Sequence, residues 1–324
     1  MGRLWRQEGG AHADIVRKQE DAAEVSKGVL ATATVNRASR MEPPAEPGWV
    51  CVSGDVYGQV RNKLPHAMNK IAPSSDFDLE LSDTISIALE TNGKGYMGFL
   101  VDLPGAFVRG KDEEEALSKV RQEAKSYLDW LGILRVAPTK WQVVQRHHCQ
   151  LMVEDADGEI LLDADRGTLP EEEFQTLAKL VHRSARTFKS LYDTSALKHW
   201  VDPSRARRTF YGERPKTIQE VFDHVNATQH YYFSRAGLPP RKEETDFLAT
   251  RELYTNEIER LFRSQGNSRV YDVDNELWTL KKILRRFVWH DRIHGKAITK
   301  ILAKQKRLGL IESYEDSFGF ALPV

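Results

Sequence analysis

Residues 277–294 read Leu277-Trp-Thr-Leu-Lys-Lys-Ile-Leu-Arg-Arg-Phe-Val-Trp-His-Asp-Arg-Ile-His294, and this stretch decides the fold of the second half of the chain. Its apolar residues recur every three or four positions, which predicts an amphipathic helix that runs from about Leu277 to Leu302. His290 and His294 lie on the same apolar stripe. The pattern therefore predicts two imidazoles on the face that packs against other helices.

Three more helical segments precede this one. Two of them begin at the four-residue patterns Thr168-Leu-Pro-Glu171 and Thr217-Ile-Gln-Glu220, both typical of capping boxes. The third ends near Gly266. Four amphipathic helices without an intervening sheet predict an all-α four-helix bundle over residues 168–305. We expect residues 306–324 to form a C-terminal tail.

A different pattern occupies residues 83–154. Apolar and polar residues alternate from Thr84, and Asn92-Gly-Lys-Gly95 predicts a hairpin turn before a second strand. We expect a short third strand near Phe107, a helix from Lys111 that ends at Gly132, and a last strand from Trp141 to Val153. This β-β-β-α-β order, followed by the helices, places the chain in the α+β class.

The remaining segments lack a sustained apolar period. We expect residues 1–48 to be a disordered leader, 49–82 a poorly defined linker and 155–167 a linker between the two domains. Met41 is an alternative start, so it stays open whether residues 1–48 belong to the natural protein.

Composition narrows the classes of function. The 324 residues hold 47 Lys and Arg against 47 Asp and Glu, which argues against binding dominated by nucleic acid or an anionic membrane. Cys51 and Cys149 form no CxxC pair, and the chain has neither an 18-residue apolar run nor a signal-peptide core. We expect a cytoplasmic protein whose metal ligands, if any, are carboxylates and some of its 10 histidines.

The spacing of His290 and His294 favours a metal site. Residues four apart on a helix lie about 5–6 Å from each other, and buried imidazoles without partners cost about 1–3 kcal/mol each. A divalent ion would satisfy both, with His224 of the second helix as the best third ligand and His230 as its rival. The alternative is that these histidines are hydrogen-bonded or exposed.

The two helices that carry these histidines resemble a known family. Thr217-Ile-Gln-Glu-Val-Phe-Asp-His-Val-Asn-Ala-Thr-Gln-His-Tyr-Tyr-Phe-Ser-Arg235 and residues 277–294 are similar to the second and fourth helices of the DinB-like (DinB/YfiT-type) metal-binding bundles. In that family one histidine of the second helix and two of the last helix hold the metal, which implies His224, His290 and His294. Gly295, inside the last helix, departs from a good helix sequence because glycine costs about 1 kcal/mol relative to alanine.

The first domain has a resemblance of its own. Residues 84–132, with Asp102-Leu-Pro-Gly-Ala-Phe-Val-Arg-Gly110 at their centre, are similar to the HicB-like antitoxin fold. The pairing of a HicB-like with a DinB-like part resembles a type of uncharacterised bacterial protein. The toxin-neutralising role of the antitoxins is not carried over to this chain.

Together these features favour a metal-dependent enzyme. Three histidines leave a coordination position open, as in catalytic zinc sites, and zinc or nickel suits all-imidazole ligation. The resemblance implies a small-thiol S-transferase, with a low-molecular-weight thiol as cosubstrate, or a hydrolase of a small molecule. No general base is evident, and Asp291 points away from His290. The alternative is a stress-response or protein-interaction module with a vestigial or regulatory metal and protein contacts through the HicB-like domain.

Partners follow from the same features. We expect a small-molecule substrate or thiol and no membrane, and a homodimer stays open. The last helix is rich in Lys and Arg, which could mark a nucleic-acid surface, but the zero net charge favours a solvated face instead.

Overall fold

The computed structural model describes residues 2–6, 49–53, 77, 79 and 81–320, except 134 and 240–245. Two short strands, β1 (Gly2–Arg6) and β2 (Trp49–Ser53), pair antiparallel in the first of two compact units. The rest of the predicted leader and most of the predicted linker lie outside the described residues. The second unit, Leu79–Trp130 with Arg135–Val324, holds both the sheet and the long helices.

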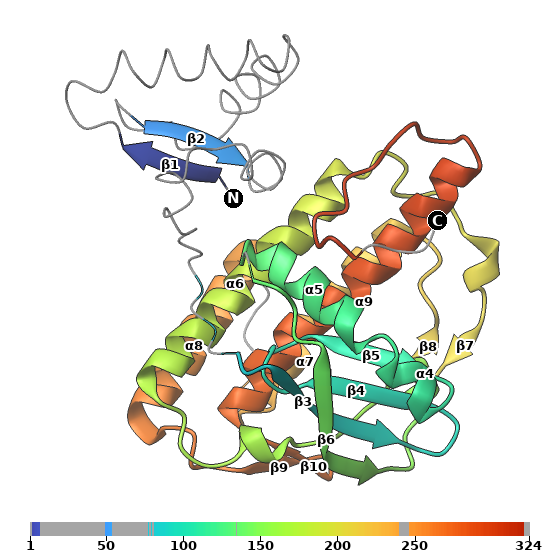
Figure 1. The fold of residues 1–324 in the computed structure, drawn as a ribbon. Helices are drawn as coiled ribbons and strands as arrows, with labels where there is room; N and C mark the ends of the chain where they lie inside the picture. Colours follow the sequence, from blue (N-terminus) through green and yellow to red (C-terminus); the bar gives the residue numbers. More distant parts are fainter. Residues whose placement is uncertain are drawn as a thin grey trace. The chain divides into compact units, whose positions relative to one another are not determined.

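The sheet has four strands in the order β5-β4-β3-β6 (Figure 1). They are β3 (Thr84–Thr91), β4 (Tyr96–Leu100), β5 (Phe107–Gly110) and β6 (Lys140–His148). Strands β3, β4 and β5 are antiparallel neighbours, whereas β6 returns parallel to β3. The predicted hairpin is confirmed, because Thr91 pairs with Tyr96 and the Asn92 Oδ1 atom accepts hydrogen bonds from two backbone N–H groups of the turn.

The predicted helix between β5 and β6 is interrupted. It forms α4 (Glu113–Leu117) and α5 (Val120–Leu131), and Asp112 caps the first of them by accepting a hydrogen bond from the Glu115 backbone N–H. The last strand was predicted to reach Val153, but β6 ends at His148. Strand β6 ends there because its partner β3 ends at Thr91, which pairs with His148, and residues 153–155 form a 3-10 turn instead.

Four long helices follow the sheet and pack against one another (Figure 1). They are α6 (Glu171–Thr194), α7 (Ile218–Ser234), α8 (Phe247–Gln265) and α9 (Leu280–Arg307). Two small hairpins accompany them, β7 (Arg208–Thr209) with β8 (Gly212–Glu213) and β9 (Tyr271–Val273) with β10 (Glu276–Trp278). None of the described helices has the length and apolar character needed to cross a membrane.

The two predicted capping boxes had different outcomes. The box at α7 is confirmed, because the Thr217 hydroxyl and the Glu220 carboxylate each accept a backbone N–H of the other residue. The box at Thr168 is wrong, since α6 begins at Glu171 with Pro170 as its N-cap and no side-chain cap. The physical reason is that proline disfavours a helical conformation in the residue before it. Leu169 is therefore kept out of the helix, which begins after Pro170 and not after Thr168.

The sheet packs directly on the middle of α9. The Trp289 ring lies 6.3 Å from the Phe99 ring and 6.4 Å from the Phe107 ring, both on the sheet. Gly105, in the Leu-Pro-Gly turn before β5, has a φ of 88°, and a Cβ atom there would lie 2.5 Å from a Val288 methyl group. The turn therefore needs glycine for its backbone angle and for its close approach to α9.

The basic side of α9 is buried over its first half and not solvated as the sequence suggested, whereas Lys300, Lys306 and Arg307 near its end are exposed. Lys282, Arg285 and Arg292 are almost fully buried. Each is paired with a carboxylate from elsewhere: Lys282 with Glu276 at 2.8 Å, Arg285 with Asp165 at 2.6 Å and Arg292 with Glu123 at 2.8 Å. The three acids lie on β10, before α6 and on α5. The prediction failed because charge counting along one helix does not show which acids from distant segments cover it.

The end of the chain also packs on α9. Phe318 is fully buried, and its ring lies 2.6 Å from where a Cβ atom of residue 295 would stand. Gly295 is thus required by the tail, which explains why this helix accepts a residue of poor helix propensity. The Arg292 guanidinium lies 5.7 Å from the centre of the Phe318 ring and 5.2 Å from that of Phe320.

A buried polar cluster joins the four long helices. The Arg251 guanidinium (α8) donates two hydrogen bonds to the Asp291 carboxylate (α9), at 2.7 and 3.0 Å. Ser184 (α6) donates to the same carboxylate at 2.6 Å, and Arg251 Nε donates to Gln229 Oε1 (α7) at 2.8 Å. We name these four side chains the four-helix cluster. Its Asp291 directly follows His290 on α9.

Candidate metal centre

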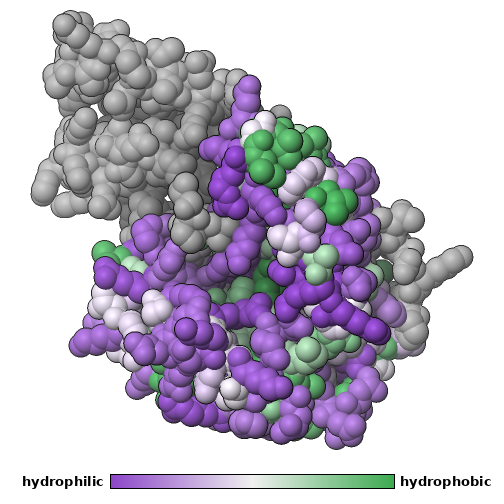
Figure 2. Space-filling view, turned by 90° about the vertical axis from the view of Figure 1, so that its right-hand side faces the viewer, coloured by the Kyte–Doolittle hydropathy of each residue, from purple (hydrophilic) through white to green (hydrophobic). Residues whose placement is uncertain are grey.

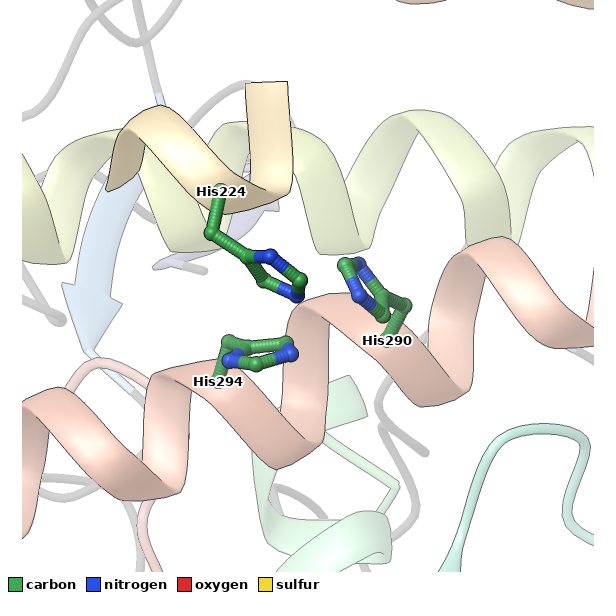
Figure 3. Close-up of side chains that lie close together, drawn as sticks. All are labelled: His224, His290 and His294. Carbon is green, nitrogen blue, oxygen red and sulfur yellow. The ribbon is translucent and has the colours of Figure 1, made fainter. Parts of the chain in front are cut away.

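Three histidine side chains from two helices point toward one another (Figure 3). His224 extends from α7, and His290 and His294 extend from successive turns of α9. Their ring centres lie 5.3 Å (224 to 290), 4.6 Å (224 to 294) and 4.3 Å (290 to 294) apart. One ring nitrogen of each lies within 4.8 Å of the others, so the structure brings together all three residues that the sequence singled out.

The surroundings keep these three imidazoles neutral. Burial lowers the pKa of His224, and it lowers the pKa of His290 and His294 well below the usual range. Charge on neighbouring imidazoles adds to the effect at His290 and His294. Within the described part of the chain, no hydrogen bond to these imidazoles is present. Neutral imidazoles with unused ring nitrogens are the form in which histidine binds metals.

The donor set fits a divalent metal ion. Ligand nitrogens at 2.0–2.1 Å from a tetrahedral zinc ion lie about 3.4 Å from one another. The three nitrogens are within 4.8 Å before any ion is bound, so small rotations of the rings suffice. Three protein ligands leave a coordination position for a small molecule.

His230, the rival third ligand, lies elsewhere. Its Nδ1 atom is 3.2 Å from the Tyr254 hydroxyl of α8, on the side of α7 that faces away from the triad. His147 is likewise engaged, with its Nε2 atom 3.1 Å from a Glu159 carboxylate oxygen. These two histidines therefore fit the hydrogen-bonded alternative, and the triad does not.

A cavity of about 1370 Å³ opens beside the triad. Its walls come from the sheet, the β7–β8 hairpin, α7 and α9, and it includes all three histidines. Figure 2 shows this side of the molecule, where mostly hydrophilic residues surround a recess with hydrophobic residues at depth. A cavity of this size holds a small organic molecule with room for water.

Several lining residues are not evident from sequence reasoning. The Tyr211 ring, at the tip of the β7–β8 hairpin, stacks on His224 with ring centres 5.1 Å apart. The Tyr232 and Trp289 rings flank His290 at 5.3 and 6.1 Å. Tyr231 also lines the cavity, and burial raises its pKa. Only the helical spacing of Tyr232 and Trp289 relative to the histidines could have indicated them.

The lowered histidine pKa values predict how the stability of the metal-free protein depends on pH. The unfolded chain takes up protons on these imidazoles near the ordinary pKa of about 6.5, whereas the folded chain does so only at lower pH. The free energy of unfolding should therefore fall as the pH falls below about 6.5. Urea unfolding at pH 7.5, 6.5 and 5.5 measures this slope, which should be shallower in His294→Asn. Equal slopes in the two proteins would contradict the prediction.

Comparisons of the chain with protein-family models, with curated proteins and with solved structures found no match. The interpretation of the centre therefore rests on its donor atoms, its burial and the cavity beside it.

Proposed function

We propose that this protein is a divalent-metal-dependent enzyme that acts on a small molecule in the cavity beside the triad. The reaction we favour is transfer of a low-molecular-weight thiol to an electrophile, with hydrolysis of a small substrate as the other chemistry of the same site. One observation carries the proposal: three imidazoles from two helices converge at the wall of a large cavity. His224, His290 and His294 would hold the ion.

Zinc and nickel are the ions that suit this ligand set. Imidazole is a good ligand for both, and the described residues offer no cysteine or carboxylate in the group. When bound, such an ion acts as a Lewis acid and lowers the pKa of a coordinating water or thiol to near neutrality.

The chain's own residues shape the site around that chemistry. Tyr232 and Trp289 are buried beside His290 and keep water from that side of the triad. Tyr211 covers His224 from the cavity side. Tyr231 lines the cavity, and burial raises its pKa, so its hydroxyl keeps its proton at neutral pH and we assign it as a candidate proton donor.

The family assignment belongs to the same proposal. We place the helices 168–305 with the DinB-like bundles and residues 83–154 with the HicB-like fold. The order β-β-β-α-β and the positions of the three histidines on the second and last long helices support it.

Metal loading tests the proposal directly. The untagged protein, incubated with Zn²⁺ or Ni²⁺ and then desalted, should retain about one ion per chain by mass spectrometry. A ligand at 100 times its Kd stabilises the folded state by about 2.7 kcal/mol, so the melting temperature should rise on adding metal. Absence of a stoichiometric ion and of a thermal shift with Zn²⁺, Ni²⁺, Mn²⁺ and Fe²⁺ would refute the metal site.

Activity is tested separately with the loaded protein. Small thiols such as cysteine and glutathione are mixed with 1-chloro-2,4-dinitrobenzene, and model esters with water. Turnover that requires metal and is lost in His290→Ala supports the enzyme. Stoichiometric metal without turnover of either substrate class would favour a binding module with a regulatory ion.

A further inference from the structure

Five cationic side chains form one side of the cavity beside the triad. We name them the basic wall: Arg109, Arg205, Arg214, Lys296 and Lys300. Arg109 comes from β5, Arg205 and Arg214 from the segment that carries the β7–β8 hairpin, and the two lysines from α9. Segments about 100 residues apart in sequence thus place positive charge at one location.

The members of the basic wall are close enough to act on one another. Burial lowers the pKa of Lys300, and the positive charges of Lys296, Arg109, Arg214 and Arg205 lower it further. Burial also lowers the pKa of Arg205 to about 10, and among the charged neighbours the positive Arg214 acts most strongly in the same direction. Like charges repel at short range, so holding these groups together without a counter-ion costs free energy.

The acids nearby offset this charge only in part. Lys296 lies 3.5 Å from Glu123, but that carboxylate is already paired with the buried Arg292 at 2.8 Å. Asp155 is paired with Arg207, which lines the same cavity but is not part of the basic wall, and its negative charge also acts on Arg109. Asp202 is paired with Lys304, so its negative charge offsets the repulsion at Arg205 only in part.

Four members form no ion pair with a carboxylate of the described residues: Arg109, Arg205, Arg214 and Lys300. The Arg109 guanidinium donates a hydrogen bond to the Glu154 backbone carbonyl oxygen. Arg205 Nε donates to the Pro215 carbonyl oxygen at 2.8 Å, which uses one of its donors. Among the described residues, no side-chain hydrogen bond or ion pair engages the Arg214 guanidinium or the Lys300 ammonium group. Both line the cavity, so their donors are available to a ligand inside it.

The basic wall is part of the same cavity as the triad. On α9, Lys296 and Lys300 follow His294 by two and six residues. In the hairpin segment, Tyr211 stacks on His224 three residues before Arg214. A small molecule in this cavity can therefore contact both the wall and the imidazoles.

We propose that the basic wall binds a multiply charged oxyanion group, a phosphate or a set of carboxylates, at one end of a small molecule whose other end reaches the triad. A planar guanidinium group donates two parallel hydrogen bonds to two oxygen atoms of a carboxylate or a phosphate. The cations line a hollow rather than an extended stripe, which suits a compact anion better than a nucleic-acid backbone. The anion site stands on its own, and only the reach to the triad rests on the proposed function.

Calorimetric titration of the metal-free full-length protein tests the anion site. The protein is stripped of metal with a chelator and exchanged into chelator-free buffer of low ionic strength. Inorganic pyrophosphate and citrate are the probes, and they represent the phosphate and carboxylate sources. Both probes should bind more tightly than chloride does. Their affinity should fall as salt is added, because the contacts are between charged groups.

Matched variants place the site on the wall. Arg214→Gln and Lys300→Gln should each raise the Kd of the tighter-binding probe by about tenfold, because the loss of one hydrogen bond to a charged group lowers affinity by about that factor. Arg208→Gln, in the same hairpin, and Lys306→Gln, on the same helix, remove exposed cations that do not line the cavity and should leave the Kd unchanged.

The outcomes separate the two proposals. Anion binding without metal loading would support the anion site and refute the metal site. Metal loading without anion binding would support the metal site and refute the anion site. The anion site is also overturned if neither probe binds, if the two control variants lose as much affinity as the wall variants, or if a single-stranded oligonucleotide binds more tightly than both probes through the same residues.

Discussion

Replacing Asp291 with alanine should destabilise the protein by about 3–5 kcal/mol, because removal of one partner of a buried ion pair leaves the other charge uncompensated. Arg251 is 1% exposed and Asp291 0% exposed. The guanidinium also lies over the Phe287 ring, with its carbon 4.5 Å from the ring centre. The total stability of a domain is about 5–15 kcal/mol, so a loss of this size is a large fraction of it.

Urea unfolding followed by circular dichroism measures this loss, and two further variants give it meaning. Ser184→Ala removes one hydrogen bond to the same carboxylate and should cost only about 1 kcal/mol. Asp291→Asn keeps the shape of the side chain but not its charge, so its cost should fall between the other two. A loss below about 1 kcal/mol in Asp291→Ala would show that the four-helix cluster does not hold the helices together.

Replacing any one histidine of the triad should reduce metal affinity at least about a hundredfold. Structural zinc sites with four ligands bind with about 10–16 kcal/mol, which corresponds to about 3 kcal/mol for each ligand. The three imidazoles share the ion in the proposed site, so His224→Ala, His290→Ala and His294→Ala should weaken binding by similar factors. Competition with a chromogenic chelator measures each Kd.

His230→Ala is the matched control for this series. It lies on the same helix as His224, but its ring faces Tyr254 and not the triad. Its metal affinity should equal that of the wild type even if its melting temperature falls slightly. If His230→Ala weakens binding as much as His224→Ala does, the assignment of the third ligand to His224 fails.

Much of the fold was predictable because its signals are local. Alternation from Thr84 and the Asn92 turn gave the first hairpin, and a capping box at Thr217 marked the start of α7 to within a residue. The start of α6 was misplaced because Thr168 and Pro170 offer competing helix starts within three residues. The break between α4 and α5 left no mark in the apolar period.

The candidate site was predictable only where its residues share a helix or a helical face. The spacing of His290 and His294 is visible in the sequence, and so is the placement of His224 on one side of α7. The basic wall is not, because Arg109, Arg214 and Lys300 meet only through tertiary packing. The role of Asp291 was missed for the same reason: its partner Arg251 lies 40 residues away on another helix.

The buried cations of α9 make the long helices depend on the part of the chain that precedes them. Arg292 depends on Glu123 from the segment that follows the sheet's first three strands, and Arg286 donates a hydrogen bond to the Gly158 carbonyl oxygen. A gene fragment that begins at residue 168 would encode a bundle whose central helix carries charges with no counterpart. Separate expression of the long helices would therefore leave the buried Arg285 and Arg292 without their carboxylate partners, Asp165 and Glu123.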